Sequence, residues 1–182
     1  MSKRAHFLGD LLKALEPQLN NMVTIIHDDR EGISIGAKRN HLVNSCATTY
    51  SSFIDDDDMI SPNYVAKHLE LLKSNPDGIG FYGIYTIDGR SPSKFIHSAK
   101  FGAWSEKSMG QTKEYYRTLN HWNVLKNEFR IKAPFPDISF GEDHQQSNDM
   151  HPLINAKNCY DITDEPMYFY NFRNGISVTS IR

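Results

Sequence analysis

Four consecutive carboxylates, Asp55–Asp58, directly follow the short apolar run Ser52–Ile54. Like charges this close together raise one another's pKa, so such a run is tolerated where water or a cation separates the side chains. Carboxylate oxygens suit Mg²⁺ or Mn²⁺, which usually takes one or two protein ligands and completes its shell with substrate phosphates and water. An Asp-x-Asp pattern at a strand end therefore suits a metal–diphosphate complex. The alternative is a solvated acidic turn that caps a helix beginning at Ser61.

Carboxylates also gather at two other points of the sequence. His27-Asp28-Asp29 follows the β-prone run Met22–Ile26, and Glu142-Asp143 opens a segment predicted to be a helix. A positioned carboxylate can serve as a general base towards an acceptor hydroxyl. In the first turn of a helix it can instead only stabilise the helix through its dipole. The residues alone leave both readings open.

Helices and strands alternate around the first two acidic clusters. Apolar residues recur at helical spacing near the N-terminus, at Phe7, Leu8, Leu11, Leu12 and Leu15. We predict helices over 5–16, 37–46 and from Ser61-Pro62 to about residue 74, and strands over 22–26 and 50–54. This alternation favours a parallel α/β sheet with a helix on each crossover. Ligands bind beyond the carboxyl ends of such strands, so we expect both acidic clusters at one edge of the sheet.

The pattern changes after Gly78. We predict strands over 79–87, 94–97, 115–117, 157–162, 167–172 and 176–181, helices over 126–131 and 142–154, and loops over 102–111 and 134–141. The turn Asp88-Gly89 is expected to join the first two of these strands as a hairpin.

The composition is that of one soluble globular domain. The 182 residues are 39% apolar and 23% charged, with a formal net charge of −2 and a pI near 6.4. This balance gives no electrostatic reason to bind nucleic acid or a membrane surface. No apolar run is long enough to span a membrane, and Cys46 and Cys159 form neither a metal pattern nor a disulfide framework. We therefore expect a cytoplasmic protein, and the sequence leaves its oligomeric state open.

Three motifs resemble, in order and at plausible spacings, those of GT-A glycosyltransferases of the inverting family 2. Phe53–Asp58 is similar to the family's Asp-x-Asp (DXD) motif, and Gly36-Ala-Lys-Arg-Asn40 is similar to the segment that precedes it. Gly141-Glu-Asp-His144 is similar to the downstream Glu-Asp motif. Together they cover much of Met22–Ile154. The resemblance implies a Rossmann-like GT-A fold, with a mostly parallel sheet flanked by helices and a smaller mixed or antiparallel acceptor side.

The resemblance also implies an activity and a cofactor. The enzyme would move a sugar, hexose-like, from a nucleotide-diphosphate donor such as a UDP-sugar to the hydroxyl of a saccharide or another acceptor, with Mn²⁺ or Mg²⁺. An inverting transfer needs one carboxylate to take the acceptor proton and a cation to stabilise the charge developing on the leaving diphosphate.

The candidate site residues fall into four groups. The catalytic candidates are Asp143 as the base and Glu142 beside it. The nucleotide-binding candidates are Asp28, Asp29, Arg39, Asp55 and Asp56. The metal candidates are Asp57 with Asp55, and His144 as a further metal or phosphate ligand. His121, Trp122 and Tyr82 are candidates to line the sugar or acceptor pocket, although a lone histidine or aromatic residue is more often structural.

The chain departs from the family at its start. Family members open with a strand before the first helix, whereas this sequence begins almost at that helix. Read head to tail, Ile176–Arg182 followed by Met1–Leu8 resembles the missing strand, loop and helix. We therefore hypothesise a circular permutation, in which residues 1–77 and 176–182 form the nucleotide-binding part and residues 78–175 form the acceptor and catalytic part. An ordinary edge strand or tail is the alternative.

Other functions fit the sequence less well. A sugar-phosphate nucleotidyltransferase would carry a glycine-rich basic loop after its first strand, and no such loop is present. A haloacid-dehalogenase-like phosphatase has Thr or Val where this chain has Met59, and its partner motifs are not found. A non-catalytic nucleotide-sugar or carbohydrate-binding module would not need both Asp57 and Asp143.

Overall fold

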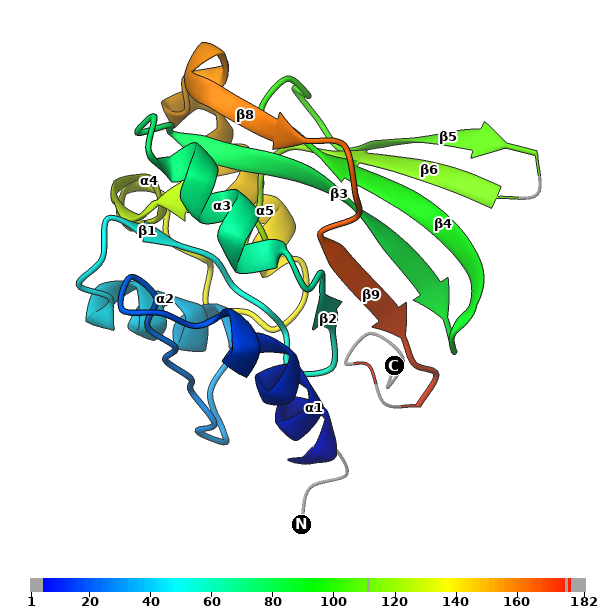
Figure 1. Cartoon of the computed structure of the whole chain (residues 1–182), viewed down its shortest axis with the longest axis horizontal. Coiled ribbons are helices and arrows are strands. Elements are labelled where there is room, and N and C mark those ends of the chain that lie inside the picture. The colour runs from blue at the N-terminus through cyan, green and yellow to red at the C-terminus, as the bar shows by residue number, and fades with distance from the viewer. Residues whose placement is uncertain (1–4, 111, 176, 178–182) are drawn as a thin grey trace.

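The computed structural model describes residues 5–110, 112–175 and 177, and arranges them as one mixed sheet with helices packed on it (Figure 1). The helices are α1 (Ala5–Leu15), α2 (Ile35–Ser45), α3 (Tyr64–Leu72), α4 (Asn127–Lys132) and α5 (Glu142–Met150), with 3-10 turns at Glu16–Gln18, His151–Leu153 and Ala156–Asn158. The strands are β1 (Tyr50–Ser51), β2 (Met59–Ile60), β3 (Gly78–Ile87), β4 (Arg90–His97), β5 (Ser105–Met109), β6 (Thr112–Arg117), β7 (Val124–Lys126), β8 (Cys159–Ile162) and β9 (Tyr168–Phe172).

The long strand β3 is the centre of the sheet. The strand order is β1-β7-β3-β4-β6-β5, with β8 and β9 also paired to β3 and β2 paired to β9. The pairs β3–β8, β3–β9 and β4–β6 are parallel, whereas β1–β7, β2–β9, β3–β4, β3–β7 and β5–β6 are antiparallel. The α/β class is as predicted, but the sheet has more antiparallel pairing than the expected mostly parallel arrangement.

The predicted strand over Met22–Ile26 is wrong. Among the described residues no strand pairs with this segment, and Met22 is 65% exposed. The Val23 N–H donates to the Asn20 carbonyl in a turn. Because β-branched residues favour a strand only when a neighbour pairs with it, local propensity alone does not form one here.

The predicted C-terminal strand 176–181 lies, apart from Ser177, outside the described residues, so the circular permutation stays a hypothesis. Ser177 closes a turn after β9, where its Oγ accepts from the Arg173 N–H at 2.9 Å. Arg173 in turn donates to the Asp57 carbonyl.

The predicted helices all appear, with ends shifted by a few residues and with residues 151–153 in a 3-10 turn rather than in α5. The predicted loop over 102–111 is wrong, because Ser105–Met109 forms strand β5 against β6. All five residues of β5 are exposed, so burial does not alternate along this strand, and its sequence gives no alternating pattern of polar and apolar residues. Its Glu106 carboxylate pairs with the Lys113 ammonium on β6.

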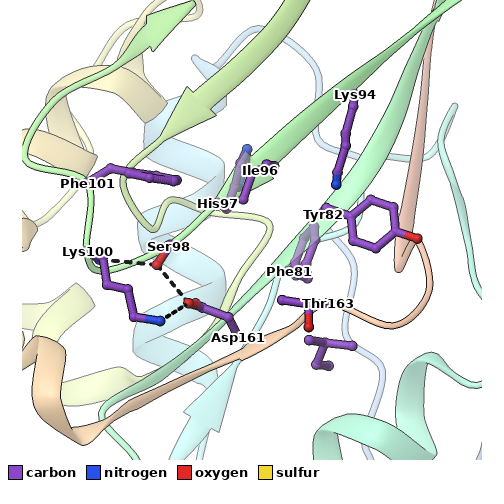
Figure 2. Close-up of a pocket in the computed structure, with 11 residues that line it drawn as sticks. Phe81, Tyr82, Lys94, Ile96, His97, Ser98, Lys100, Phe101, Asp161 and Thr163 are labelled. Atoms are coloured by element: carbon purple, nitrogen blue, oxygen red, sulfur yellow. Dashed lines mark hydrogen bonds and ion pairs between the residues drawn. The ribbon is translucent and has the colours of Figure 1, made fainter.

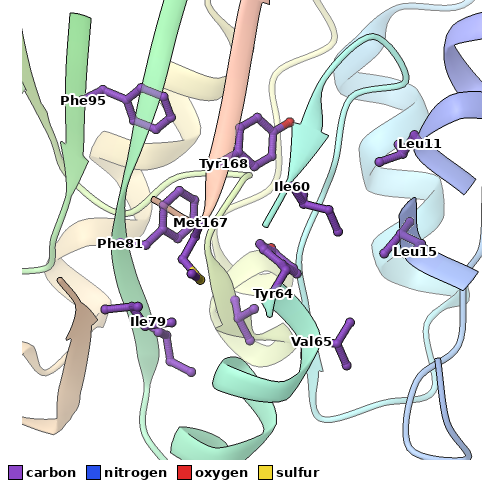
Figure 3. Close-up of a cluster of buried hydrophobic side chains, with 12 residues drawn as sticks. Leu11, Leu15, Ile60, Tyr64, Val65, Ile79, Phe81, Phe95, Met167 and Tyr168 are labelled. Carbon is purple, nitrogen blue, oxygen red and sulfur yellow. The ribbon is translucent and has the colours of Figure 1, made fainter. Parts of the chain in front are cut away.

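The hydrophobic core lies on one face of the sheet, called here the inner face (Figure 3). Phe81 on β3 stacks on Tyr168 of β9 and packs near Phe95 of β4. Gly83 makes this packing possible, since a Cβ there would lie 2.2 Å from Phe95 Cζ and 2.4 Å from the Tyr168 carbonyl. Helices α1 and α3 cover this face with Leu11, Leu15, Tyr64 and Val65.

The opposite face of the sheet, the outer face, is covered at only one end. Side chains alternate along a strand, so Tyr82 and Ile84 point away from the face that holds Phe81. A second core cluster, made of Ala99, Leu119, Leu125, Phe129, Ala133 and Met150, packs under α4 and α5.

In the described residues no helix has both the length and the apolar character to cross a membrane, and both cysteines are free thiols.

Two buried histidines predict how stability depends on pH. Burial lowers the pKa of His68 to about 4 and that of His97 to about 3. In the unfolded chain both side chains titrate at about 6.5, so the unfolded state takes up protons first as the pH falls. The free energy of unfolding should therefore decrease from about pH 6.5 down to about pH 4. His68→Leu should make this decrease shallower, as measured by urea unfolding across that range.

The exposed His41 supplies the control for this experiment. His41→Gln should leave the slope of stability against pH unchanged. An unchanged slope in His68→Leu would show that His68 does not titrate in this way.

Candidate active site

A single buried guanidinium joins the three motifs singled out in the sequence. Arg39 on α2 is 7% exposed. Its Nη1 donates to Glu142 Oε1 at 2.6 Å, and its Nη2 donates to Asp55 Oδ1 at 3.0 Å. The same guanidinium lies 5.8 Å from the ring centre of Phe53 and 5.6 Å from that of Phe135. The segment 36–40, the DXD motif and the Glu-Asp motif therefore meet at Arg39.

The position of Arg39 is set by how α2 docks on the loop before α5. Ser34 caps α2, its Oγ accepting from the Ala37 N–H. Asn40 makes two bonds to Phe135, donating to its carbonyl at 2.8 Å and accepting from its N–H at 2.9 Å. Gly36 allows the close approach, because its N–H donates to the Ile138 carbonyl and a Cβ would fall 1.9 Å from the Pro136 carbonyl oxygen.

Asp55 is held by donors on both carboxylate oxygens. Besides Arg39, Trp122 Nε1 donates to Oδ2 at 3.2 Å, and His121 Nε2 lies 3.5 Å from the same oxygen. Burial would raise the pKa of Asp55, but the charge of Arg39 and the contacts from His121 and Trp122 hold it well below the usual range. Asp55 is thus fixed as a carboxylate, with 36% of its side chain still exposed.

Asp57 and Asp58, further along the acidic run, are more deeply buried than Asp55. Asp58 is buried and accepts from the Tyr168 hydroxyl at 2.8 Å, while its Oδ1 has no hydrogen-bond partner among the described residues. Burial, and next the nearby charge of Asp55, raise the pKa of Asp58 well above its usual value. Asp57 is also buried, at 8% exposure, and its carbonyl accepts from Arg173 at 2.6 Å. Asp56 is half-buried between Asp55 and Asp57.

The Glu-Asp motif begins α5 on the other side of Arg39. Gly141 precedes the helix in the left-handed conformation, with φ at +80°, which glycine adopts without strain. Burial raises the pKa of Glu142 although Arg39 lowers it in part. Asp143 keeps 26% of its side chain exposed, and its Oδ2 lies 3.7 Å from His121 Nδ1. His121 therefore lies between Asp55 and Asp143, the partly exposed carboxylates of the two motifs.

The other predicted residues lie away from this group. His144 packs on Trp104, with ring centres 4.6 Å apart, and lies 3.3 Å from the Asn148 side-chain amide. Asp28 is ion-paired with Arg30, which lowers its pKa, and Asp29 is exposed. Among the described residues, neither aspartate shares a hydrogen bond or ion pair with Arg39 or Asp55.

Tyr82 is on the outer face, away from the carboxylates. Figure 2 shows it beside a cavity of about 120 Å³ that is also lined by Lys94, Ile96 and Asp161. The Lys94 ammonium lies 4.3 Å from the centre of the Tyr82 ring. The structure therefore does not bring Tyr82 to the site with His121 and Trp122.

The acidic run offers carboxylate oxygens to a divalent cation. Within the part of the chain that the structure describes, no three His, Cys, Asp or Glu side chains come close enough together to form a metal cage. Mg²⁺ and Mn²⁺ sites on nucleotides commonly need only one or two protein carboxylates, because substrate phosphates complete them. The run Asp55–Asp58, with its buried Asp58 oxygen that has no partner, is consistent with such an open site.

Sequence reasoning missed Tyr168 and Arg173. The Tyr168 hydroxyl accepts from the Asp55 N–H at 3.1 Å and donates to Asp58, so it fixes the backbone and a side chain of the acidic run together. Arg173 follows β9 directly and holds the Asp57 carbonyl. The available signal was the pair of tyrosines two positions apart in β9, because residues two apart on a strand lie on the same face, as Tyr168 and Tyr170 do.

The fold is that of a GT-A glycosyltransferase. The model of the Glycosyl transferase family 2 matches residues 8–146, and the chain belongs to this family. Among curated proteins, no sequence matches the chain significantly.

Solved structures of S. aureus TarS share the fold. The structure of TarS residues 1–349 in complex with UDP-GlcNAc superposes with a TM-score of 0.62 at 16% sequence identity, covering 94% of this chain and 48% of that one. The complex of the same TarS fragment with UDP gives a TM-score of 0.59 at 15% identity, covering 93% of this chain and 48% of that one. The chain thus spans about half the length of the TarS fragment that it matches.

The contact between α2 and the 134–141 loop predicts that a methyl group at Gly36 is not tolerated. Gly36→Ala forces the Pro136 backbone to move, so the free energy of unfolding should fall by about 1–3 kcal/mol. The matched control is Gly9→Ala in α1, where a Cβ meets nothing within 4 Å and where alanine should be neutral or stabilising by up to about 1 kcal/mol. Urea unfolding measures both, and equal effects would contradict the prediction.

The buried pair of Arg39 and Glu142 predicts a strong energetic coupling. Arg39→Met leaves the Glu142 carboxylate buried without its cation, so the free energy of unfolding should fall by about 3–5 kcal/mol. Arg39→Met combined with Glu142→Gln should recover part of that loss, because no uncompensated charge remains on Glu142. A double-mutant cycle measured by urea unfolding checks this, and strictly additive losses would show that the two side chains do not interact.

Proposed function

We propose that this protein is a metal-dependent, inverting glycosyltransferase that moves a sugar from a nucleotide-diphosphate-sugar to an acceptor hydroxyl. The observation that carries the proposal is the arrangement around His121 and Arg39. They connect Asp55 of the acidic run to Asp143 and Glu142 at the start of α5. Such a transfer needs two adjacent but separate sets of carboxylates. One set binds the cation that stabilises the leaving diphosphate, and the other takes the proton of the attacking hydroxyl.

A UDP-sugar is the donor that best agrees with the comparisons, because the TarS structures of the same fold hold UDP-GlcNAc and UDP. We assign Asp55 and Asp56 to the nucleotide, and Asp28 and Asp29 to its base. Arg39 has each terminal nitrogen engaged by a carboxylate and is almost fully buried, which favours a positioning role over direct contact with the nucleotide.

Asp57, with help from Asp55, would hold Mn²⁺ or Mg²⁺ together with the donor diphosphate. The cation would supply positive charge to the oxygens of the departing diphosphate. The protein's own contribution here is to fix the acidic run. Tyr168 binds Asp58 and the Asp55 N–H, and Arg173 binds the Asp57 carbonyl.

Asp143 is the proposed general base. Its carboxylate is partly exposed, so an acceptor hydroxyl can reach it, and its Oδ1 accepts from the His144 N–H at 2.8 Å. In an inverting transfer the acceptor oxygen bonds to the anomeric carbon as the bond to the diphosphate breaks, and the hydroxyl proton passes to the base. His121 and the first turn of α5 orient that base, and Glu142 contributes by anchoring α5 to Arg39.

Two other functions remain as outcomes of the test. A non-catalytic module would bind a nucleotide-sugar and never release UDP. A sugar-phosphate nucleotidyltransferase would form the nucleotide-sugar from a nucleoside triphosphate and a sugar phosphate, and would release pyrophosphate.

The carboxylate assignments predict distinct losses in two variants. With UDP-GlcNAc and Mn²⁺, Asp143→Asn should slow UDP release about 10²–10⁴-fold while leaving UDP binding intact, because it removes only the proton acceptor. Asp57→Ala should remove the dependence of UDP binding on Mn²⁺. UDP release is measured with and without a mixed acceptor panel, and UDP binding is measured by calorimetry with Mn²⁺ and with a chelator.

The matched control is Asp149→Asn, an exposed carboxylate on the same helix α5. It should behave as the wild type in both assays. Wild-type turnover in Asp143→Asn would refute its role as the base, and Mn²⁺-dependent UDP binding in Asp57→Ala would refute the metal assignment.

A further inference from the structure

Beside the carboxylates, a row of aromatic side chains continues along the inner face of the sheet. Tyr85 on β3 lies directly opposite Tyr170 on the parallel strand β9, and their ring centres are 5.4 Å apart. Tyr115 on β6 meets Tyr85 edge to face at 5.9 Å. In Figure 1, α1 and α3 lie over the other half of the sheet, and all three tyrosines are only half-buried.

The row extends from Tyr115 towards the proposed base. The Arg117 guanidinium lies 5.2 Å from the centre of the Tyr115 ring and 4.8 Å from that of Trp104. Trp104 is fixed in place, since its Nε1 donates to Thr118 Oγ1 at 3.1 Å. The Trp104 ring packs on His144, the residue next to Asp143. We call Trp104, Arg117, Tyr115, Tyr85 and Tyr170 the aromatic band.

The other end of the aromatic band reaches the acidic run. The ring centre of Tyr170 is 5.3 Å from that of Trp122, and the Trp122 indole donates to Asp55. Burial, and next the nearby charge of Asp58, raise the pKa of Tyr170. The aromatic band therefore begins beside the proposed base and ends beside the proposed donor site.

The aromatic band offers both apolar faces and polar groups. The hydroxyls of Tyr85, Tyr115 and Tyr170 have no hydrogen-bond partner among the described residues, and Arg117 adds a cation between two rings. A lipid chain would leave these polar groups unpaired. A sugar chain matches them, because each ring has an apolar C–H face that can pack on an aromatic ring and hydroxyls that can bond at its edge.

We propose that the aromatic band binds the acceptor and that the acceptor is a saccharide chain of more than one sugar. This inference rests on the proposed function and specifies its acceptor. Every residue of the aromatic band comes from residues 78–175, which we assigned to the acceptor part of the chain. The rings position the sugar chain along the sheet, so that its terminal hydroxyl meets Asp143.

The test compares residues on the two faces of the same strands. Binding of chitotetraose, cellotetraose and maltotetraose to the full chain is measured by saturation-transfer NMR, and binding of UDP with Mn²⁺ is measured by calorimetry. At least one tetrasaccharide should bind. Tyr85→Leu and Tyr115→Leu should each weaken that binding about tenfold and leave UDP binding unchanged, since leucine keeps most of the packing but removes the ring.

The matched controls are Tyr82→Leu and Tyr116→Leu, which change outer-face residues of β3 and β6. They should bind the tetrasaccharide as the wild type does. The inference is overturned if no tetrasaccharide binds, if the controls weaken binding as much as the inner-face variants, or if a proline-rich decapeptide binds the aromatic band instead. Tetrasaccharide binding without any UDP binding would refute the proposed function and leave the aromatic band as a sugar site.

Discussion

The site depends on one desolvated ion pair network. Arg39 is almost fully buried, and a buried guanidinium is costly unless carboxylates surround it in good geometry. Asp55 and Glu142 meet that requirement from segments 16 and 103 residues away in the sequence. The same contacts fix the spacing between the acidic run and the start of α5. The electrostatic requirement of one side chain therefore determines the relative position of the two carboxylate motifs.

The two faces of the sheet carry different groups of side chains. On the inner face, the apolar core around Phe81 is followed along the strands by the aromatic band and the carboxylates, so the proposed catalytic groups lie beside a packed core. On the outer face, Tyr82, Lys94 and Ile96 surround a small cavity that shares no residue with the site. The direction of a side chain, rather than its position in the sequence, thus decides which aromatic residues can meet a substrate.

Much of the fold followed from local patterns, and the rest needed tertiary contacts. Helical spacing of apolar residues located α1, and the strands predicted over 79–87 and 167–172 agree with β3 and β9. The segment Met22–Ile26 looked like a strand but has no pairing neighbour among the residues that the structure describes, and β5 is a strand although all its side chains are exposed. The strand propensity of a single segment predicts neither result, because the pairing of a strand depends on two segments.

The site shows the same limit. The acidic run and the Glu-Asp pair were recognisable as motifs, but the sequence did not indicate that Arg39 joins them or that Tyr168 holds Asp58. Tyr82 was a candidate for the sugar pocket because it is aromatic, and it is adjacent to Phe81 in the sequence. That adjacency puts the two rings on opposite faces of β3, so the choice of Phe81 for the core excludes Tyr82 from the site.

The two tryptophans of the chain stand at the two ends of the proposed site. Trp122 shares a hydrogen bond with Asp55 beside the proposed donor site, and Trp104 packs on His144 beside the proposed base. Indole fluorescence responds to charge and solvent at the ring, so the protein carries a separate intrinsic probe for each half of its site. A single-tryptophan form would report filling of one half while the other stays optically silent.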